Sequence, residues 1–246
     1  MNVLHWHSQG CVAQEYNNLI EGKKALKKQK GRRKQSHKRA KRKAVLASRK
    51  NDQSITLRSP LNQARSISST FGINYCLVTE NLFELGIGYV VLGRTMSSTM
   101  VATALFLVDV HCLGVKNAFF SKRTHSELRL FIDRLSADGN TMVDISPECA
   151  KKIIDGAVAY AKKFNFSPHA DYPPAYALFG DTNTDACPIE YEFGKDGKPF
   201  FVSGPNDTPA KIRKVIRSLT ETAGAGNFDY IVEAGPPHES HLGSDY

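Results

Sequence analysis

A dense run of positive charge near the start of the chain sets the strongest limit on what this sequence can fold into. Residues 22–50 contain fifteen Lys and Arg side chains and no Asp or Glu. Like charges at this density repel one another, and too few apolar residues accompany them to form a core. We therefore predict a disordered basic arm. Because most residues from Arg32 onward are good helix formers, an anionic partner that neutralised them could induce a helix.

The remainder of the 246-residue chain has the composition of a folded protein. Outside the arm, eighteen basic residues face twenty-four acidic ones, which leaves a net charge of −6. The whole chain is 41% hydrophobic and 23% charged, as is usual for globular proteins. Apolar runs such as residues 104–108 are too short to span a bilayer, so we expect no membrane partner. The expected parts are a poorly ordered N-terminus (1–21), the basic arm (22–50), a polar linker (51–70), one folded domain (71–234) and a C-terminal tail (235–246).

Hydrophobic periodicity within residues 71–234 predicts strands and helices in the order ββααββαβ. We expect strands at 86–93, 101–112, 189–193, 199–202 and 228–232, and helices that begin after Thr124, Ser146 and Thr208. Hairpins rather than single strands alternate with the helices, which favours an α+β domain with an antiparallel or mixed sheet. Residues 101–112 begin with apolar side chains on both faces and are expected to open onto solvent or a cleft near Asp109.

The cysteines indicate neither a disulfide framework nor a zinc site. They are five, an odd number, and no pair has the CxxC spacing. The first twenty residues contain no Lys or Arg and no sustained apolar segment, so no secretory signal is expected. These observations favour a reduced, cytoplasmic protein. The cysteines are Cys11, Cys76, Cys112, Cys149 and Cys187.

The arm carries the strongest functional signal in the sequence. Lys and Arg at this density attract a polyanion and release its condensed counterions, whatever the base sequence. His37 is the only ring in the arm, so base stacking and strong sequence preference are not expected from it. A targeting signal, a solvated tail and an anionic membrane surface remain alternatives. The arm residues expected to contact nucleic acid are Lys23, Lys24, Lys27, Lys28, Lys30, Arg32, Arg33, Lys34, Lys38, Arg39, Lys41, Arg42 and Lys43.

A second candidate site combines Asp109, His111 and Lys116. Side chains at i and i+2 of a strand project to the same face, so the carboxylate could orient the imidazole as a general base. Lys116 could then stabilise developing charge. The alternative is an ordinary ion pair on a half-exposed strand.

Two further patterns are better explained by turns and caps than by ligands. His169, Asp171, Asp181, Asp185 and Cys187 offer metal-binding atoms without a spacing that fixes a coordination geometry. Residues 204–209 precede a helix N-terminus that could hold a phosphate, but the charge of Asp207 would repel it. We therefore predict no metal and no cofactor.

Residues 104–119 (ALFLVDVHCLGVKNAF), 185–200 (DACPIEYEFGKDGKPF) and 204–207 (GPND) carry a resemblance to a group of uncharacterised bacterial proteins. The resemblance covers about residues 74–233 and leaves the arm outside it. It implies one compact bacterial domain and transfers no activity and no functional residue.

Together these patterns predict a cytoplasmic protein that binds nucleic acid through its arm, RNA more readily than DNA. RNA is favoured because the arm lacks a motif for reading a duplex and resembles basic segments that fold on structured RNA. One alternative is a hydrolase or nuclease that uses Asp109 and His111 while the arm holds the substrate. Another is a protein-interaction module whose acidic domain binds a partner.

Overall fold

The computed structural model describes residues 59–137 and 139–232, so the predicted arm, N-terminus and C-terminal tail lie outside the described residues. Its centre is one antiparallel sheet in the order β4-β3-β2-β1-β5. The α+β class and the antiparallel sheet are therefore confirmed. The strands are β1 (Ile73–Thr79), β2 (Ile87–Thr95), β3 (Met100–Asp109), β4 (Gly114–Thr124) and β5 (Met142–Asp144).

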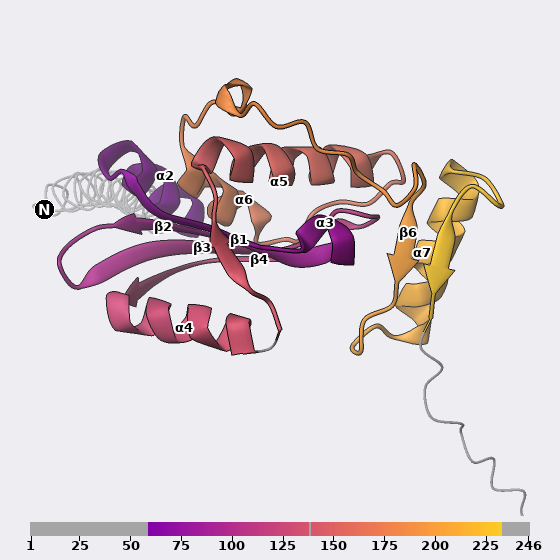
Figure 1. Cartoon of the computed structure of the whole chain (residues 1–246), viewed down its shortest axis with the longest axis horizontal. Helices are drawn as coiled ribbons and strands as arrows, with labels where there is room; N and C mark the ends of the chain where they lie inside the picture. Colours follow the sequence, from indigo (N-terminus) through magenta and orange to yellow (C-terminus); the bar gives the residue numbers. More distant parts are fainter. Residues whose placement is uncertain (1–58, 138, 233–246) are drawn as a thin grey trace, which may run out of the picture. The chain divides into compact units, whose positions relative to one another are not determined.

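Helices cover both faces of this sheet, as Figure 1 shows with α5 and α6 above it and α4 beneath. One face packs against α5 (Pro147–Lys162), α6 (Tyr172–Tyr176) and the short 3-10 helix η1 (Ala177–Phe179). The other packs against α4 (His125–Ala137), which buries Leu128 and Leu135. Burial on both sides explains why β2 and β3 are apolar on both faces.

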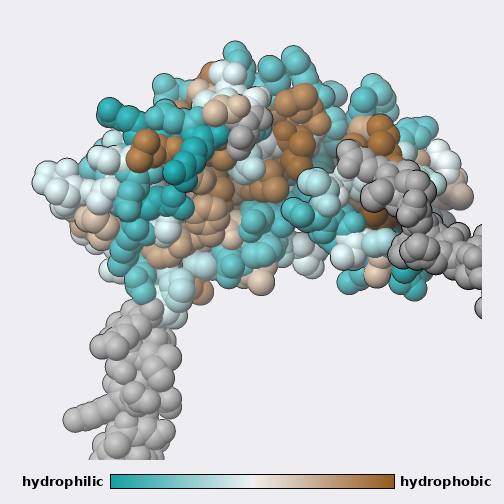
Figure 2. Space-filling model, turned by 90° about the horizontal axis from the view of Figure 1, so that it is seen from below, coloured by the Kyte–Doolittle hydropathy of each residue, from teal (hydrophilic) through white to brown (hydrophobic). Residues whose placement is uncertain are grey.

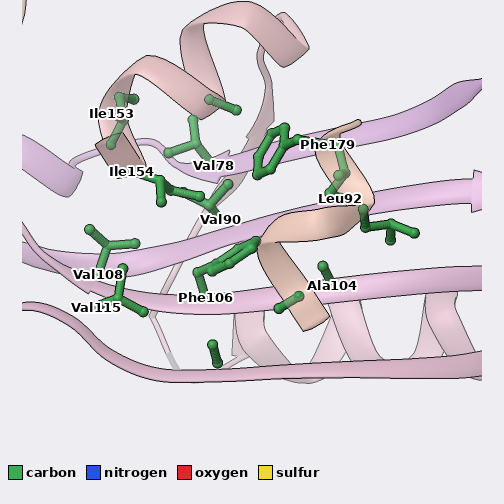
Figure 3. Close-up of a cluster of buried hydrophobic side chains, with 14 of the residues drawn as sticks. Val78, Val90, Leu92, Ala104, Phe106, Val108, Val115, Ile153, Ile154 and Phe179 are labelled. Atoms are coloured by element: carbon green, nitrogen blue, oxygen red, sulfur yellow. The ribbon is translucent and has the colours of Figure 1, made fainter. Parts of the chain in front are cut away.

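The main core lies between the sheet and α5. Phe106 is fully buried, and Ile153 and Ile154 of α5 pack into the same cluster. Phe179 of η1 closes the cluster, and its ring centroid is 5.9 Å from that of Phe106 (Figure 3). The predicted apolar stripes therefore do mark the inward sides of the helices.

The predicted helix starts are confirmed in atomic detail. Thr124 and Glu127 form the capping box at α4: the Thr124 amide donates to Glu127 Oε2 at 2.7 Å, and the Glu127 amide donates to Thr124 Oγ1 at 3.2 Å. Ser146 caps α5, and Thr208 caps α7 (Pro209–Thr222).

Within the described residues, the structure adds three strands, three α-helices and two 3-10 helices to the predicted order of elements. Strands β1, β4 and β5 were not predicted, and the first two extend the predicted hairpin on either side. Hydrophobic and polar residues alternate poorly along β4, because it is an edge strand with exposed lysine and asparagine. Such polar residues protect an edge strand from mispairing. Residues 60–70, assigned to the polar linker, instead form α2 (Pro60–Thr70), capped by Ser59 with Ala64 and Ile67 buried.

The predicted hairpin of 189–193 with 199–202 is wrong. Residues 189–193 form no strand, because Tyr191 and Phe193 pack their rings against Phe83 of α3 (Leu82–Leu85). Strand β6 (Phe200–Val202) pairs in parallel with β7 (Asp229–Ile231) instead. The tight Asp-Gly turn is present nonetheless, with positive φ at Asp196 and Gly197.

A smaller unit of β6, β7 and α7 packs against the end of the main sheet where β3 turns into β4. Phe201, Val215 and Leu219 form a cluster with Cys112 and Leu113 of that turn. The Phe200 amide also donates to the His111 carbonyl at 3.1 Å. These contacts cover the region near Asp109, which was expected to open onto solvent or a cleft.

The structure also corrects the prediction that the cysteines form no disulfide. Cys149, at the start of α5, is bonded to Cys187, and their Cα atoms are 5.0 Å apart. Cys187 follows the short 3-10 helix η2 (Thr184–Ala186). The spacing of the cysteines did not predict this bond, because Cys149 and Cys187 are separated by 38 positions. The two residues meet only after α6 and η1 have turned the chain back. Cys76 and Cys112 are buried free thiols. No described helix has the length and apolar character that crossing a bilayer requires.

A buried arginine ties α2 and η1 to the sheet. Arg94 lies near the end of the central strand β2 and is only 6% exposed. Its guanidinium donates from Nε to the Leu178 carbonyl at 2.7 Å and from an Nη to the Phe179 carbonyl at 2.9 Å. It also donates to the carbonyl of Phe71, the residue that ends α2. One side chain thus satisfies three backbone acceptors from two different elements.

We predict that Arg94→Met destabilises the domain by about 2–4 kcal/mol, because it leaves the carbonyls of Leu178 and Phe71 without their donor, whereas the Phe179 carbonyl keeps the Thr182 hydroxyl. The measurement is the midpoint of urea unfolding. Arg213→Met, which removes an exposed arginine from α7, is the matched control and should shift stability by less than about 0.5 kcal/mol. Equal effects of the two variants would contradict the role of Arg94.

We also predict that a reductant lowers the free energy of unfolding by about 3–4 kcal/mol, because it opens the loop that the Cys149–Cys187 bond closes. Cys187→Ser should lose this stability and no longer respond to the reductant. Cys76→Ser, which leaves the bond intact, should still respond. A wild-type protein insensitive to reductant would show that the bond adds no stability.

Candidate nucleic-acid interface and the Asp109 turn

Asp109 is the last residue of β3 and organises the turn into β4. It is 6% exposed, and its Oδ1 accepts hydrogen bonds from the amides of His111 at 3.0 Å and Cys112 at 2.8 Å. Burial raises the pKa of this carboxyl, although the hydrogen bonds and the charge of Lys116 act in the opposite direction. Asp109 therefore stabilises the turn through the backbone.

His111 lies in that turn rather than on the strand, because β3 ends at Asp109. Its Nε2 donates to the Phe83 carbonyl at 3.0 Å, and the residue is 7% exposed. The ring lies against Gly86, where an added Cβ would be 2.0 Å from Nδ1. Gly86 also has a φ of +79°, so two constraints favour glycine at this position.

Lys116 lies on β4 and is half-buried. Its positive charge opposes the burial that raises the pKa of Asp109, and it contributes to the lowered pKa of Asp207. Asp207 accepts from Lys211 Nζ at 2.6 Å and from the Gly204 amide at 2.8 Å. Burial acts to raise the pKa of Asp207, but these hydrogen bonds and charges outweigh it and leave the pKa below its usual value.

The three predicted catalytic residues are thus close in the fold but do not form the expected dyad. In the described part of the chain, the partners of the Asp109 carboxylate are backbone amides, and the imidazole of His111 bonds to a backbone carbonyl. A carboxylate that does not touch the imidazole cannot orient it as a base. This geometry supports a structural turn.

The other sequence candidates also form local contacts. His169 Nδ1 lies 3.9 Å from Asp171 Oδ2, and within residues 59–137 and 139–232 no three metal-ligating side chains gather into a cluster. At the start of α7, the Thr208 hydroxyl caps the helix by accepting from the Lys211 amide, and the Asp207 carboxylate accepts from Lys211 Nζ and the Gly204 amide.

The exposed face of α7 carries positive charge that the sequence reasoning did not single out. Arg213, Lys214 and Arg217 lie opposite the buried Val215 and Leu219, and all three are exposed. None of the three forms an ion pair with a described residue. The first turn of α7 contains no acidic residue, and cations near a helix N-terminus oppose its dipole. In the sequence, this positively charged face could have been found from the basic residues that lie between the apolar positions of the predicted helix.

Comparison of the chain with protein-family models, with curated proteins and with solved structures gives no match.

We predict that Asp109→Ala destabilises the domain by about 2–3 kcal/mol, because two buried amides lose their acceptor. Asp109→Asn keeps an acceptor oxygen and should cost less. The folded protein holds the Asp109 proton more tightly than the unfolded chain, so this group lowers stability as the pH rises above about 3.9. The Asn variant should therefore gain stability relative to wild type between pH 4 and pH 7. Urea unfolding at several pH values measures this difference. A constant difference would contradict a raised pKa.

Proposed function

We propose that this protein binds nucleic acid, and RNA in preference to DNA, through its basic arm at residues 22–50. The observation that carries this proposal is the segregation of charge: fifteen cationic side chains without an acid in the arm, against a net charge of −6 elsewhere. An unbranched polyanion is the partner that such an arm suits best, because each phosphate contact releases condensed counterions. We further propose that the protein needs no cofactor.

The exposed cations of α7 support this proposal from within the folded domain. Arg213, Lys214 and Arg217 offer a positively charged helix face about one turn and a half long. Arginine forms bidentate hydrogen bonds with phosphates, which suits a backbone contact without base specificity. We therefore propose that α7 makes additional phosphate contacts.

The alternative of a hydrolase or nuclease is not favoured by the contacts of Asp109 and His111. Both side chains are nine-tenths buried and hydrogen-bonded to the backbone. A general base has to reach its substrate, directly or through one water.

The test is the affinity for a single-stranded RNA measured between 50 and 200 mM salt. Deletion of residues 22–50 should abolish a binding that, for roughly six phosphate contacts, weakens on the order of 10²–10³-fold over this range. Unchanged affinity after the deletion, or binding that ignores salt, would remove the proposal. Tighter binding to an equally long DNA strand would contradict the preference for RNA.

The contribution of α7 has its own test in the full chain. Lys214→Gln with Arg217→Gln should reduce the slope of log affinity against log salt by about 1.4, the value for two contacts on a single strand. Arg129→Gln with Arg134→Gln changes the same charge on exposed positions of α4 and is the matched control. Equal slopes for the two double variants would exclude α7 from the interface.

A further inference from the structure

A cavity of about 520 Å³ lies between α2 and α6. This volume is within the range of small-molecule sites, which is about 300–1,000 Å³. The side chains that matter for its chemistry are Arg65, Ser68, Ser69, Tyr172, Tyr176 and Asp181. We call this cavity the α2–α6 groove. It is separate from the Asp109 turn, which contributes none of its lining.

Two tyrosine rings form one wall of the groove and are held firmly. The ring centroids of Tyr172 and Tyr176 are 5.0 Å apart. Tyr172 packs edge-on against the core residue Phe106, and the Tyr176 hydroxyl donates to Asp155 Oδ1 at 2.6 Å. Both rings are half-buried, so part of each remains open to the groove. Lys151 Nζ also lies 5.5 Å from the centroid of the Tyr176 ring, so the stacking surface is the exposed part of the Tyr172 ring, which is held in place at little cost in conformational entropy.

Two exposed charges of opposite sign flank the tyrosines. Arg65 on α2 forms no ion pair with a described residue, and neither does Asp181 after η1. A guanidinium suits a phosphate, whereas a carboxylate repels phosphate and accepts from an amino group such as N4 of cytosine. Cation, ring and carboxylate together match a nucleotide whose base carries an exocyclic amino group.

The width of the groove is set by the buried Arg94, which binds carbonyls at the end of α2 and in η1. Gly180 lies between the two sides with a φ of +61°. A Cβ at this position would be 3.2 Å from Arg94 and 3.2 Å from Ser68 Cβ, so a side chain would crowd both. The groove is therefore formed before any ligand binds.

The groove is also close to the arm along the chain. Only residues 51–58 separate the arm from Ser59, the cap of α2, and eight residues span at most about 30 Å. The chain therefore connects the C-terminal end of the arm to the start of α2 by a short segment.

We propose that the α2–α6 groove takes one unpaired base of the RNA that the arm binds, and that it prefers a base with an exocyclic amino group, such as cytosine, over uracil. The base stacks on Tyr172, its amino group donates to Asp181, and Arg65 contacts the adjoining phosphate. This inference rests on the proposed function and adds base preference to an arm that has none of its own.

The experiment compares the full chain and two variants for binding to oligo(C) and oligo(U) RNA of equal length. Ser69→Trp fills the groove, whereas Ser66→Trp places the same side chain on an exposed position of α2 outside the lining. Wild type and Ser66→Trp should bind oligo(C) about tenfold more tightly than oligo(U). Ser69→Trp should bind both RNAs equally and weakly, and Asp181→Ala should lose only the preference.

The outcomes separate this inference from the proposed function. If the wild-type protein binds both RNAs in a salt-dependent way but equally, and Ser69→Trp behaves like Ser66→Trp, the groove proposal is overturned while the arm proposal stands. If the full chain binds neither RNA, the proposed function fails as well. Free CMP that binds as tightly as oligo(C) would assign the groove to a mononucleotide and overturn its role in RNA binding.

Discussion

The hydrogen bonds of Arg94 are the interaction on which the arrangement of this domain depends. A guanidinium buried near the end of a central strand has to find acceptors for its donors, because burying it without them would cost several kcal/mol. Here the acceptors are carbonyls at the C-terminal end of α2 and in η1, where helical carbonyls lack intrahelical partners. One residue thereby satisfies its own donors and the free acceptors of two elements. The same contacts set the position of α2 beside α6, and with it the α2–α6 groove.

The Asp109 turn is the second polar centre, and it joins the main sheet to the unit of β6, β7 and α7. The carboxylate shapes the turn through the amides of His111 and Cys112, and the turn then offers the His111 carbonyl to Phe200 at the start of β6. Apolar contacts of Phe201 and Leu219 complete the junction. Residues that resemble a catalytic pair in sequence thus hold two packed units together, a role that accounts for their burial as well as for their polarity.

These two polar centres lie beneath a surface whose functional features are charge and aromatic rings. On the face shown in Figure 2, hydrophilic side chains divide the apolar ones into separate patches, as on an ordinary solvated surface. The proposed RNA contacts come from elsewhere: the basic arm, the cations of α7, and Tyr172 and Arg65 of the α2–α6 groove. The arm contributes affinity without base preference, and the groove contributes stacking and one carboxylate. The arm and the groove differ in this way because phosphate contacts carry no sequence information, whereas contacts with base edges do.

The amino-acid sequence by itself determined the α+β class, the caps of α4, α5 and α7, and the segregation of charge, because these depend on neighbours within a few residues. It did not reveal α2, since its serines read as a linker until the burial of Ala64 and Ile67 is known. Nor did it reveal the parallel pairing of β6 with β7 or the bond between Cys149 and Cys187, which join residues far apart in the chain. The site shows the same limit. The i, i+2 spacing of Asp109 and His111 suggested a shared strand face, and only the tertiary structure placed His111 in a turn with its imidazole bonded to Phe83. Local patterns specify local geometry, whereas the partner of a buried polar group is decided by which elements fold against it.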